Sequence, residues 1–204
     1  MSELGKAALA VVTAFFMMAG TALAQDEQPV RLSPQPADGD LKPGIAVEYY
    51  YGFRGRHTNA AWALVDATKG DPGDPIPMLD YNVGNEPMLT NTRNKFLVAH
   101  MKGAMHFKEP GTYKFTALTN DGFELNIGGA FIMEDPDVHF DRWSDIVSVE
   151  ISEPGWYDLE MLYFNRKGTA TLELYWRPPW DTSEGDMRFV PAEVFAHTPG
   201  GQPS

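Results

Sequence analysis

The stretch that decides the fold class is residues 111–127, which read GTYKFTALTNDGFELNI. Apolar and polar residues alternate on both sides of the triplet Asn120-Asp121-Gly122. The apolar members are Tyr113, Phe115, Ala117, Phe123, Leu125 and Ile127. A period of two places such side chains on one face of a β-strand. Asn, Asp and Gly tolerate the positive φ angles of tight turns. The stretch therefore predicts two strands joined by a tight turn.

The same alternation recurs on either side of residues 111–127. The strands expected outside this stretch cover residues 45–51, 96–101, 147–151, 157–163 and 170–176. Clusters of Gly, Pro and Asn separate several of them, as at Glu109-Pro110-Gly111 and Asn165-Arg166-Lys167-Gly168. Short alternating strands with turn residues between them predict an all-β fold, an antiparallel β-sandwich or barrel with long loops. The absence of a strand–helix–strand rhythm argues against a doubly wound α/β fold.

Two segments lack this pattern and are expected to be largely loops. Residues 53–94 contain a dense group of Gly, Pro and Asp at 69–75, preceded by the run AAWALVDA at 60–67, which could form two helical turns. Residues 133–145, MEDPDVHFDRWSD, are expected to form an acidic loop.

The N-terminus has the pattern of a secretory signal peptide. Lys6 precedes an apolar run at residues 7–19, and Ala22-Leu23-Ala24 offers a cleavage site. The run is shorter than the ~20 residues of a membrane span, although an uncleaved N-terminal anchor is the alternative. We therefore expect a signal peptide at 1–24 and no membrane span after its removal. The remaining segments expected are a flexible lead-in at 25–43, the β-domain at 44–198 and a disordered tail at 199–204.

Composition narrows the class of partner. Asp and Glu number 28 against 16 Lys and Arg, for a net charge of −12. Because phosphate contacts need clustered basic residues, this balance argues against nucleic acid and anionic membrane surfaces as partners. The chain has no Cys, which excludes disulfides, thiolate metal sites and a cysteine nucleophile. An exported chain without Cys favours a Gram-negative-type bacterium, with the protein in the periplasm or outside the cell.

An ordered set of segments resembles the PA14, or protective-antigen-type, domain family across residues 44–197. The segments are Gly44–Tyr50, Phe96 to Lys102-Gly103, Pro110–Phe115, Thr119–Gly129, Gly155–Glu160, Gly168–Trp176 and Phe189-Val190-Pro191. The resemblance implies a β-sandwich that binds carbohydrate or cell surfaces and has no catalytic role. In the lectin branch of the family, two adjacent aspartates in a D-D-G motif hold a Ca²⁺ that contacts sugar hydroxyls.

Carried over residue by residue, that motif falls on Asn120 and Asp121. An amide oxygen replaces one carboxylate here, which keeps a ligand but loses a charge, so weaker Ca²⁺ binding is expected. The chain also has Gly128-Gly129 where the family often has Asp before Gly. The alternative is that the triplet is a purely structural turn.

Further candidates come from the residues themselves. Glu134, Asp135 and Asp137 could present carboxylates to a cation, alone or together with Asp121, although acidic clusters usually form a solvated surface. The candidate sugar contacts are Trp143, Trp180 and Asp181, because a sugar's C–H face can lie on an exposed aromatic ring.

These features favour a secreted carbohydrate- or cell-surface-binding module with Ca²⁺-assisted glycan recognition. The alternative is a structural or protein-interaction module of the bacterial cell envelope. No nucleophile elbow, phosphate loop or dinucleotide fingerprint is present, so we expect no enzymatic activity and name no catalytic residue.

Overall fold

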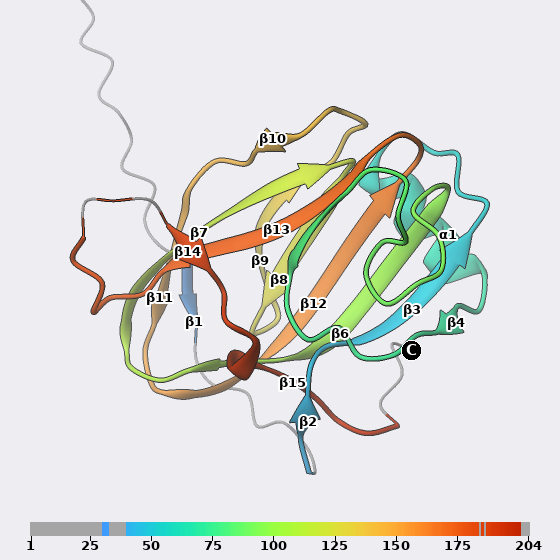
Figure 1. Ribbon diagram of the computed structural model, residues 1–204. Helices are drawn as coiled ribbons and strands as arrows, with labels where there is room; N and C mark the ends of the chain where they lie inside the picture. The colour runs from blue at the N-terminus through green and yellow to red at the C-terminus, as the bar shows by residue number, and fades with distance from the viewer. Residues whose placement is uncertain (1–29, 33–39, 184, 186, 201–204) are drawn as a thin grey trace, which may run out of the picture.

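The computed structural model of the protein describes residues 30–32, 40–183, 185 and 187–200. Two sheets face each other in two layers, so the predicted β-sandwich is confirmed (Figure 1). Most neighbouring strands pair antiparallel, and the longest, β6 (Leu97–Phe107) and β12 (Gly155–Asn165), pair over their whole length.

The first sheet has seven strands and contains the first half of residues 111–127. In spatial order its main path is β1 (Val30–Leu32), β11 (Val147–Ile151), β7 (Gly111–Asn120), β13 (Ala170–Arg177) and β14 (Arg188–Phe189). Two further strands join it, β10 (Arg142–Trp143) beside β7 and β5 (Asp80–Val83) beside β13.

The second sheet has eight strands and contains the second half of residues 111–127, so these two neighbouring strands do not pair with each other. Its main path is β2 (Lys42–Pro43), β15 (Phe195–His197), β6, β12, β8 (Phe123–Ile127) and β9 (Ala130–Asp135). Strand β3 (Ala46–Tyr51) pairs with β6 and with β4 (Asp71–Pro72), and the 3₁₀-helix η1 (Ala192–Val194) precedes β15.

The main core lies between the two sheets and follows the predicted alternation. On β12 the inward residues Tyr157, Leu159, Met161 and Tyr163 are all buried. Burial of such side chains is the dominant favourable term in folding. The opposite face of β12 is left for other contacts.

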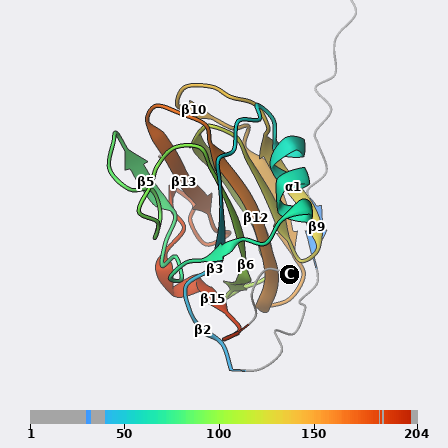
Figure 2. The ribbon, with the colours of Figure 1, turned by 90° about the vertical axis from the view of Figure 1, so that its right-hand side faces the viewer.

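A second, smaller core lies on the outer face of the eight-stranded sheet. The single α-helix of the described residues, α1 (Thr58–Ala67), covers it, as Figure 2 shows. Its buried members are Tyr50, Phe53, Ala61, Val98, Leu162 and Phe164. The helical turns expected at 60–67 are confirmed and begin two residues earlier. His57 caps the helix, since its Nδ1 accepts a hydrogen bond from the Asn59 N–H at 3.1 Å.

The prediction of a continuous acidic loop at 133–145 is wrong. Residues up to Asp135 belong to β9, and Arg142–Trp143 form β10. The pairing of β9 with β8 shifts register between Leu125 and Asn126. Such a shift breaks the period-two pattern along a strand, so the alternation is not visible in the sequence.

The expected flexible lead-in at 25–43 differs from the structure where it is described. Val30–Leu32 form β1, which pairs in parallel with β11, and Lys42–Pro43 form β2. Leu32 is buried in the main core, and a strand of three residues is too short to show a period. The expected signal peptide at 1–24 lies outside the described residues, and of the expected tail only 199–200 are described, in a turn. Within the described part, no helix is long and apolar enough to cross a membrane.

Candidate functional site

The Asn120-Asp121-Gly122 triplet links β7 in one sheet to β8 in the other, and a cis peptide bond joins Asn120 to Asp121. None of the three residues has a positive φ, so the physical reason given for this turn is wrong. Gly122 is needed for space. A Cβ there would lie 2.5 Å from a ring carbon of Phe164 and 2.9 Å from the backbone oxygen of Pro136.

The Asp121 side chain is buried beneath two loops. Its Oδ1 accepts the backbone N–H of His139 at 3.2 Å, and its Oδ2 accepts that of Arg166 at 2.8 Å. Burial raises the pKa of Asp121, and the two backbone hydrogen bonds lower it in part. A buried carboxylate thus fixes the loop around residue 139 and the turn at 165–168 against each other.

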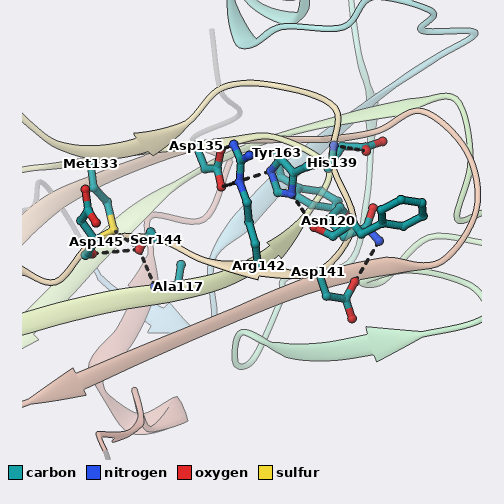
Figure 3. Close-up of polar contacts among 12 residues, drawn as sticks. Ala117, Asn120, Met133, Asp135, His139, Asp141, Arg142, Ser144, Asp145 and Tyr163 are labelled. Atoms are coloured by element: carbon teal, nitrogen blue, oxygen red, sulfur yellow. Dashed lines mark hydrogen bonds and ion pairs between the residues drawn. The ribbon is translucent and has the colours of Figure 1, made fainter.

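Asn120 is also buried and makes contacts on every side. Its Nδ2 donates to Asp141 Oδ1 at 2.8 Å and to Thr169 Oγ1 at 3.0 Å. Its backbone oxygen accepts the hydroxyl of Tyr163 at 2.6 Å. Figure 3 shows Asp141 reaching Asn120 from the loop that precedes β10. The amide therefore holds the exposed Asp141 carboxylate next to the turn.

Asn165, at the end of β12, adds an amide oxygen that has no partner. The residue is fully buried, and its Nδ2 donates to the carbonyls of Asn94 and Thr169. Its Oδ1 is buried without a hydrogen-bond partner among the described residues. A buried polar atom without a partner costs about 1–3 kcal/mol of folding free energy. The next residue in the chain, Arg166, donates its backbone N–H to Asp121.

The other predicted metal ligands do not join Asp121 in one donor set. Arg142 donates to both carboxylate oxygens of buried Asp135, through Nε at 2.6 Å and through Nη2, and His139 Nε2 lies 3.2 Å from Oδ2 (Figure 3). Glu134 is exposed and accepts a hydrogen bond from Thr58 Oγ1 at 3.4 Å, and Asp137 is exposed beside His57. In the described part of the chain, no three acidic or histidine side chains form a group that could hold a metal.

The predicted sugar contacts lie in two other places. Trp143 is 56% exposed on the outer face of the seven-stranded sheet, with its ring 4.9 Å from that of Tyr175. Trp180 follows the end of β13 and meets Tyr113 edge-on at 5.9 Å. Asp181 accepts the N–H and the hydroxyl of Ser183 at 3.1 and 2.7 Å, in a local turn.

Strand register separates Trp180 and Asp181 from the Asn120-Asp121 turn. Thr171 lies opposite Asn120, whereas Arg177, at the far end of β13, lies opposite Lys114. At about 3.4 Å per residue the two ends of β13 are roughly 20 Å apart. The turn and the Trp180-Asp181 pair therefore do not form one site.

Sequence reasoning missed Phe140, whose ring is 91% exposed. It stands between His139 and Asp141, which contact Asp121 and Asn120 respectively. The only signal for it in the sequence is a lone phenylalanine within an acidic, polar segment. Asn165 was likewise read as a turn residue, because its buried position depends on the contact between two loops.

The profile of the PA14 domain family matches residues 42–188 of this chain. No curated protein sequence matches it. Among solved structures, the PA14 domain of the antifreeze protein MpAFP aligns with a TM-score of 0.66 and 17% identity, over 80% of this chain and 95% of that one.

Two similar structures are of a sugar-binding domain and of a domain in complex with a sugar. A PA14 sugar-binding domain from an RTX adhesin has a TM-score of 0.62 and 16% identity, over 76% of this chain and 99% of that one. The A domain of epithelial adhesin 6 from Candida glabrata, in complex with Galβ1-3GlcNAc, has a TM-score of 0.60 and 15% identity. That alignment covers 84% of this chain and 94% of the other. At such identities the likeness shows the fold.

Proposed function

The chain belongs to the PA14 domain family, and from that membership we propose that it is a secreted carbohydrate-binding module. Its glycan site lies at the loops around the Asn120-Asp121-Gly122 turn, and Ca²⁺ assists binding there. The sugar-binding domain of the RTX adhesin and the glycan complex of the epithelial adhesin support a sugar ligand. Glycans on a cell surface are the class of partner that this proposal implies.

The observation that carries the proposal is the position of Phe140. An almost fully exposed ring lies in the chain between His139 and Asp141, which hydrogen-bond the buried polar groups of the turn. A sugar can place its C–H face on such a ring while polar groups beside it meet the hydroxyls. The exposed Asp141 carboxylate, next to Phe140, is the nearest such group.

The oxygen atoms at the turn fit a calcium ion. Ca²⁺ takes six to eight oxygen ligands, from carboxylates, amide oxygens, backbone carbonyls and water. Asp121, Asn120 and Asn165 would hold it, because burial disfavours the charge of Asp121 and the Asn165 Oδ1 has no partner among the described residues. A bound cation would stabilise the charge of Asp121 and give the Asn165 Oδ1 a partner. When bound, the ion would supply positive charge for sugar hydroxyl oxygens.

A glycan array tests the proposal with the full secreted chain, in Ca²⁺ and in EDTA. We expect selective binding that is reduced at least tenfold in Asp121→Ala and Phe140→Ala. The matched control is Phe131→Ala, which removes a ring 53% exposed on β9 and should bind normally. Silence across the array in both conditions, or full binding by both site variants, would contradict the glycan site.

Thermal melts test the calcium site separately. A ligand that binds only the native state at ~100 times its Kd adds about 2.7 kcal/mol, or roughly 5–10 °C for a domain of this size. We expect a saturable rise with Ca²⁺ that Asp121→Ala abolishes. No rise in melting temperature at millimolar Ca²⁺ would remove calcium from the proposal. Glycan binding would then be judged from the array in EDTA alone.

Export is tested by cell fractionation and N-terminal sequencing of the mature chain. We expect the protein in the periplasm or medium with Gln25 as its first residue. A chain that stays in the cytoplasm with Met1 intact would contradict secretion.

A second candidate function is an interaction module of the cell envelope. It is favoured by an apolar groove of about 480 Å³ on the outer face of the seven-stranded sheet, lined by Trp143, Ile146, Tyr175 and Met187 among others. Ile146 is 61% exposed there. A stoichiometric envelope partner that binds the wild-type chain and not Ile146→Ser would support this function. Failure to recover one would leave the glycan module alone.

A further inference from the structure

A polar groove lies on the outer face of the eight-stranded sheet, beside α1. Two hollows of about 510 and 520 Å³ share Trp62, Lys102 and Glu160, and together we call them the α1 groove. The second core, under α1, lies on the same face of this sheet. The Asn120-Asp121 turn does not line either hollow.

Strand register arranges the floor of the α1 groove in two rows. Glu48 on β3 lies opposite His100 on β6, and Leu162 on β12 lies opposite both His100 and Glu124 on β8. In the neighbouring row Glu160 lies opposite both Lys102 and Asn126. Side chains two residues apart on a strand share a face, so the two rows form one polar surface.

Trp62 of α1 lies over this surface. Its indole N–H donates to Glu124 Oε2 at 2.9 Å, and its ring meets that of His100 edge-on at 5.1 Å. Asn126 Nδ2 donates to the other oxygen of Glu124, also at 2.9 Å. The aromatic ring and the carboxylate are thereby held in contact with each other.

The charge of the groove is negative. Its carboxylates outnumber its ammonium groups by five to two: Glu48, Asp66, Glu124, Asp158 and Glu160 against Lys69 and Lys102. Lys102 is 3.4 Å from Glu160, and these two charges offset each other. Glu48 and Glu124, by contrast, accept hydrogen bonds from uncharged groups, the Tyr50 hydroxyl and the Trp62 and Asn126 N–H groups.

Two groups in the wall of the α1 groove are buried, the Glu48 carboxylate and the His100 imidazole. Glu48 is only 5% exposed, and burying a carboxylate is costly unless a positive charge is near. His100 is 3% exposed and its Nε2 lies 2.8 Å from Glu160 Oε1, which makes Nε2 the donor. Its Nδ1 is buried with no hydrogen-bond partner among the described residues.

We propose that the α1 groove is a second binding site, which takes a small ligand carrying a primary ammonium group. An ammonium supplies positive charge and three N–H donors, which match the carboxylates of Glu48 and Glu124, whose hydrogen-bond donors are uncharged. It also interacts favourably with the face of a tryptophan ring. The inference does not rest on the glycan site at the turn. The ammonium could come from an amino sugar or an aliphatic diamine.

Titration calorimetry and intrinsic tryptophan fluorescence with the full chain test the proposal, and Trp62→Phe shows which part of the fluorescence change comes from the groove. The probes are glucosamine, putrescine and, as uncharged controls, glucose and N-acetylglucosamine. We expect saturable binding of at least one amine and none of the uncharged sugars. Binding of glucosamine alone identifies amino sugars as the ligand, and binding of putrescine alone identifies aliphatic amines.

Variants complete the test. Glu124→Gln and Glu48→Gln keep the shape of the side chain and should weaken amine binding at least tenfold. Glu150→Gln, on β11 of the other sheet, is the matched control and should bind as wild type. The proposal is overturned if neither amine binds at millimolar concentration, if N-acetylglucosamine binds as well as glucosamine, or if both groove variants bind normally while melting as wild type.

Discussion

At the scale of single residues, the buried polar groups of Asn120 and Asp121 organise the candidate glycan site. Between them they bond the backbone of residues 139 and 166 and the side chains of Asp141 and Thr169. Buried polar groups with good partners specify one arrangement, because any alternative leaves them unsatisfied. Phe140 can therefore be exposed and still be held in place.

The amide of Asn120 is predicted to stabilise the metal-free protein and to lower its affinity for calcium. In Asn120→Asp a carboxylate would replace the donor that now faces Asp141 Oδ1 at 2.8 Å. We expect a lower melting temperature in EDTA, because two carboxylates would face each other, and a larger rise with Ca²⁺ than in wild type. The control is Asn82→Asp, at an exposed position on β5, which should change neither value. An unchanged calcium response in Asn120→Asp would place the ion elsewhere.

The pKa of Asp121 is predicted to set the pH dependence of the proposed calcium binding. Burial raises this pKa above its ordinary value of 3.8, so protons compete with Ca²⁺ at a higher pH than at an exposed aspartate. The calcium-induced rise in melting temperature should be full at pH 7 and shrink as the pH falls towards the raised pKa. Melts at a fixed Ca²⁺ concentration between pH 7.5 and 4.5 measure this. A rise that is independent of pH would contradict the role of Asp121.

The sign in EDTA is the opposite. The folded-state pKa lies above the unfolded one, so protonation of Asp121 favours the native state. This contribution is fully present below the unfolded-state pKa and is lost as the pH rises through the folded-state pKa.

At the scale of elements, the end of β12 connects the second core, under α1, to the turn. The Phe164 ring packs against Phe53 at 5.0 Å beneath the helix and also limits residue 122 to glycine. The sequence predicted the helical turns of α1 and the stripes of β12. It did not indicate that Leu162 and Phe164, on the outward face of β12, would be buried as well, since that depends on where α1 lies.

Phe164→Ala is predicted to destabilise the protein by about 3–5 kcal/mol, the usual cost of removing a buried phenylalanine ring. Urea denaturation measures the free energy of unfolding. Phe131→Ala, which removes a half-exposed ring, should change it much less. A loss below about 1 kcal/mol in Phe164→Ala would mean that the second core contributes little to folding.

At the scale of the whole molecule, the two proposed sites occupy different parts of the sandwich. The turn joins the two sheets at an end of β7 and β8, and the α1 groove lies on the outer face of one sheet. One domain could therefore bind a glycan and a small amine independently. The net charge of −12 acts on both, because it attracts cations and repels anions over the whole surface.

This charge predicts a preference among glycans. Neutral sugars should bind in preference to sulfated or sialylated ones, and the protein should pass through a heparin column at 0.15 M salt without retention. The same experiment with DNA-cellulose extends the prediction to nucleic acid. Retention on either matrix at this salt concentration would reveal a basic patch that the overall charge does not indicate.

The sequence by itself determined the β-sandwich, most of its strands and the link between two of them at Asn120-Asp121-Gly122. These follow from local patterns, period-two alternation and turn residues, which any stretch of chain displays on its own. The tertiary structure decided which polar residues meet. It paired Asp135 with Arg142, separated Trp180 from the turn, and brought Arg166 onto Asp121 and Glu48 into line with His100 and Glu124. Such contacts depend on the register and order of strands that are distant in the chain, and local periodicity carries no information about either.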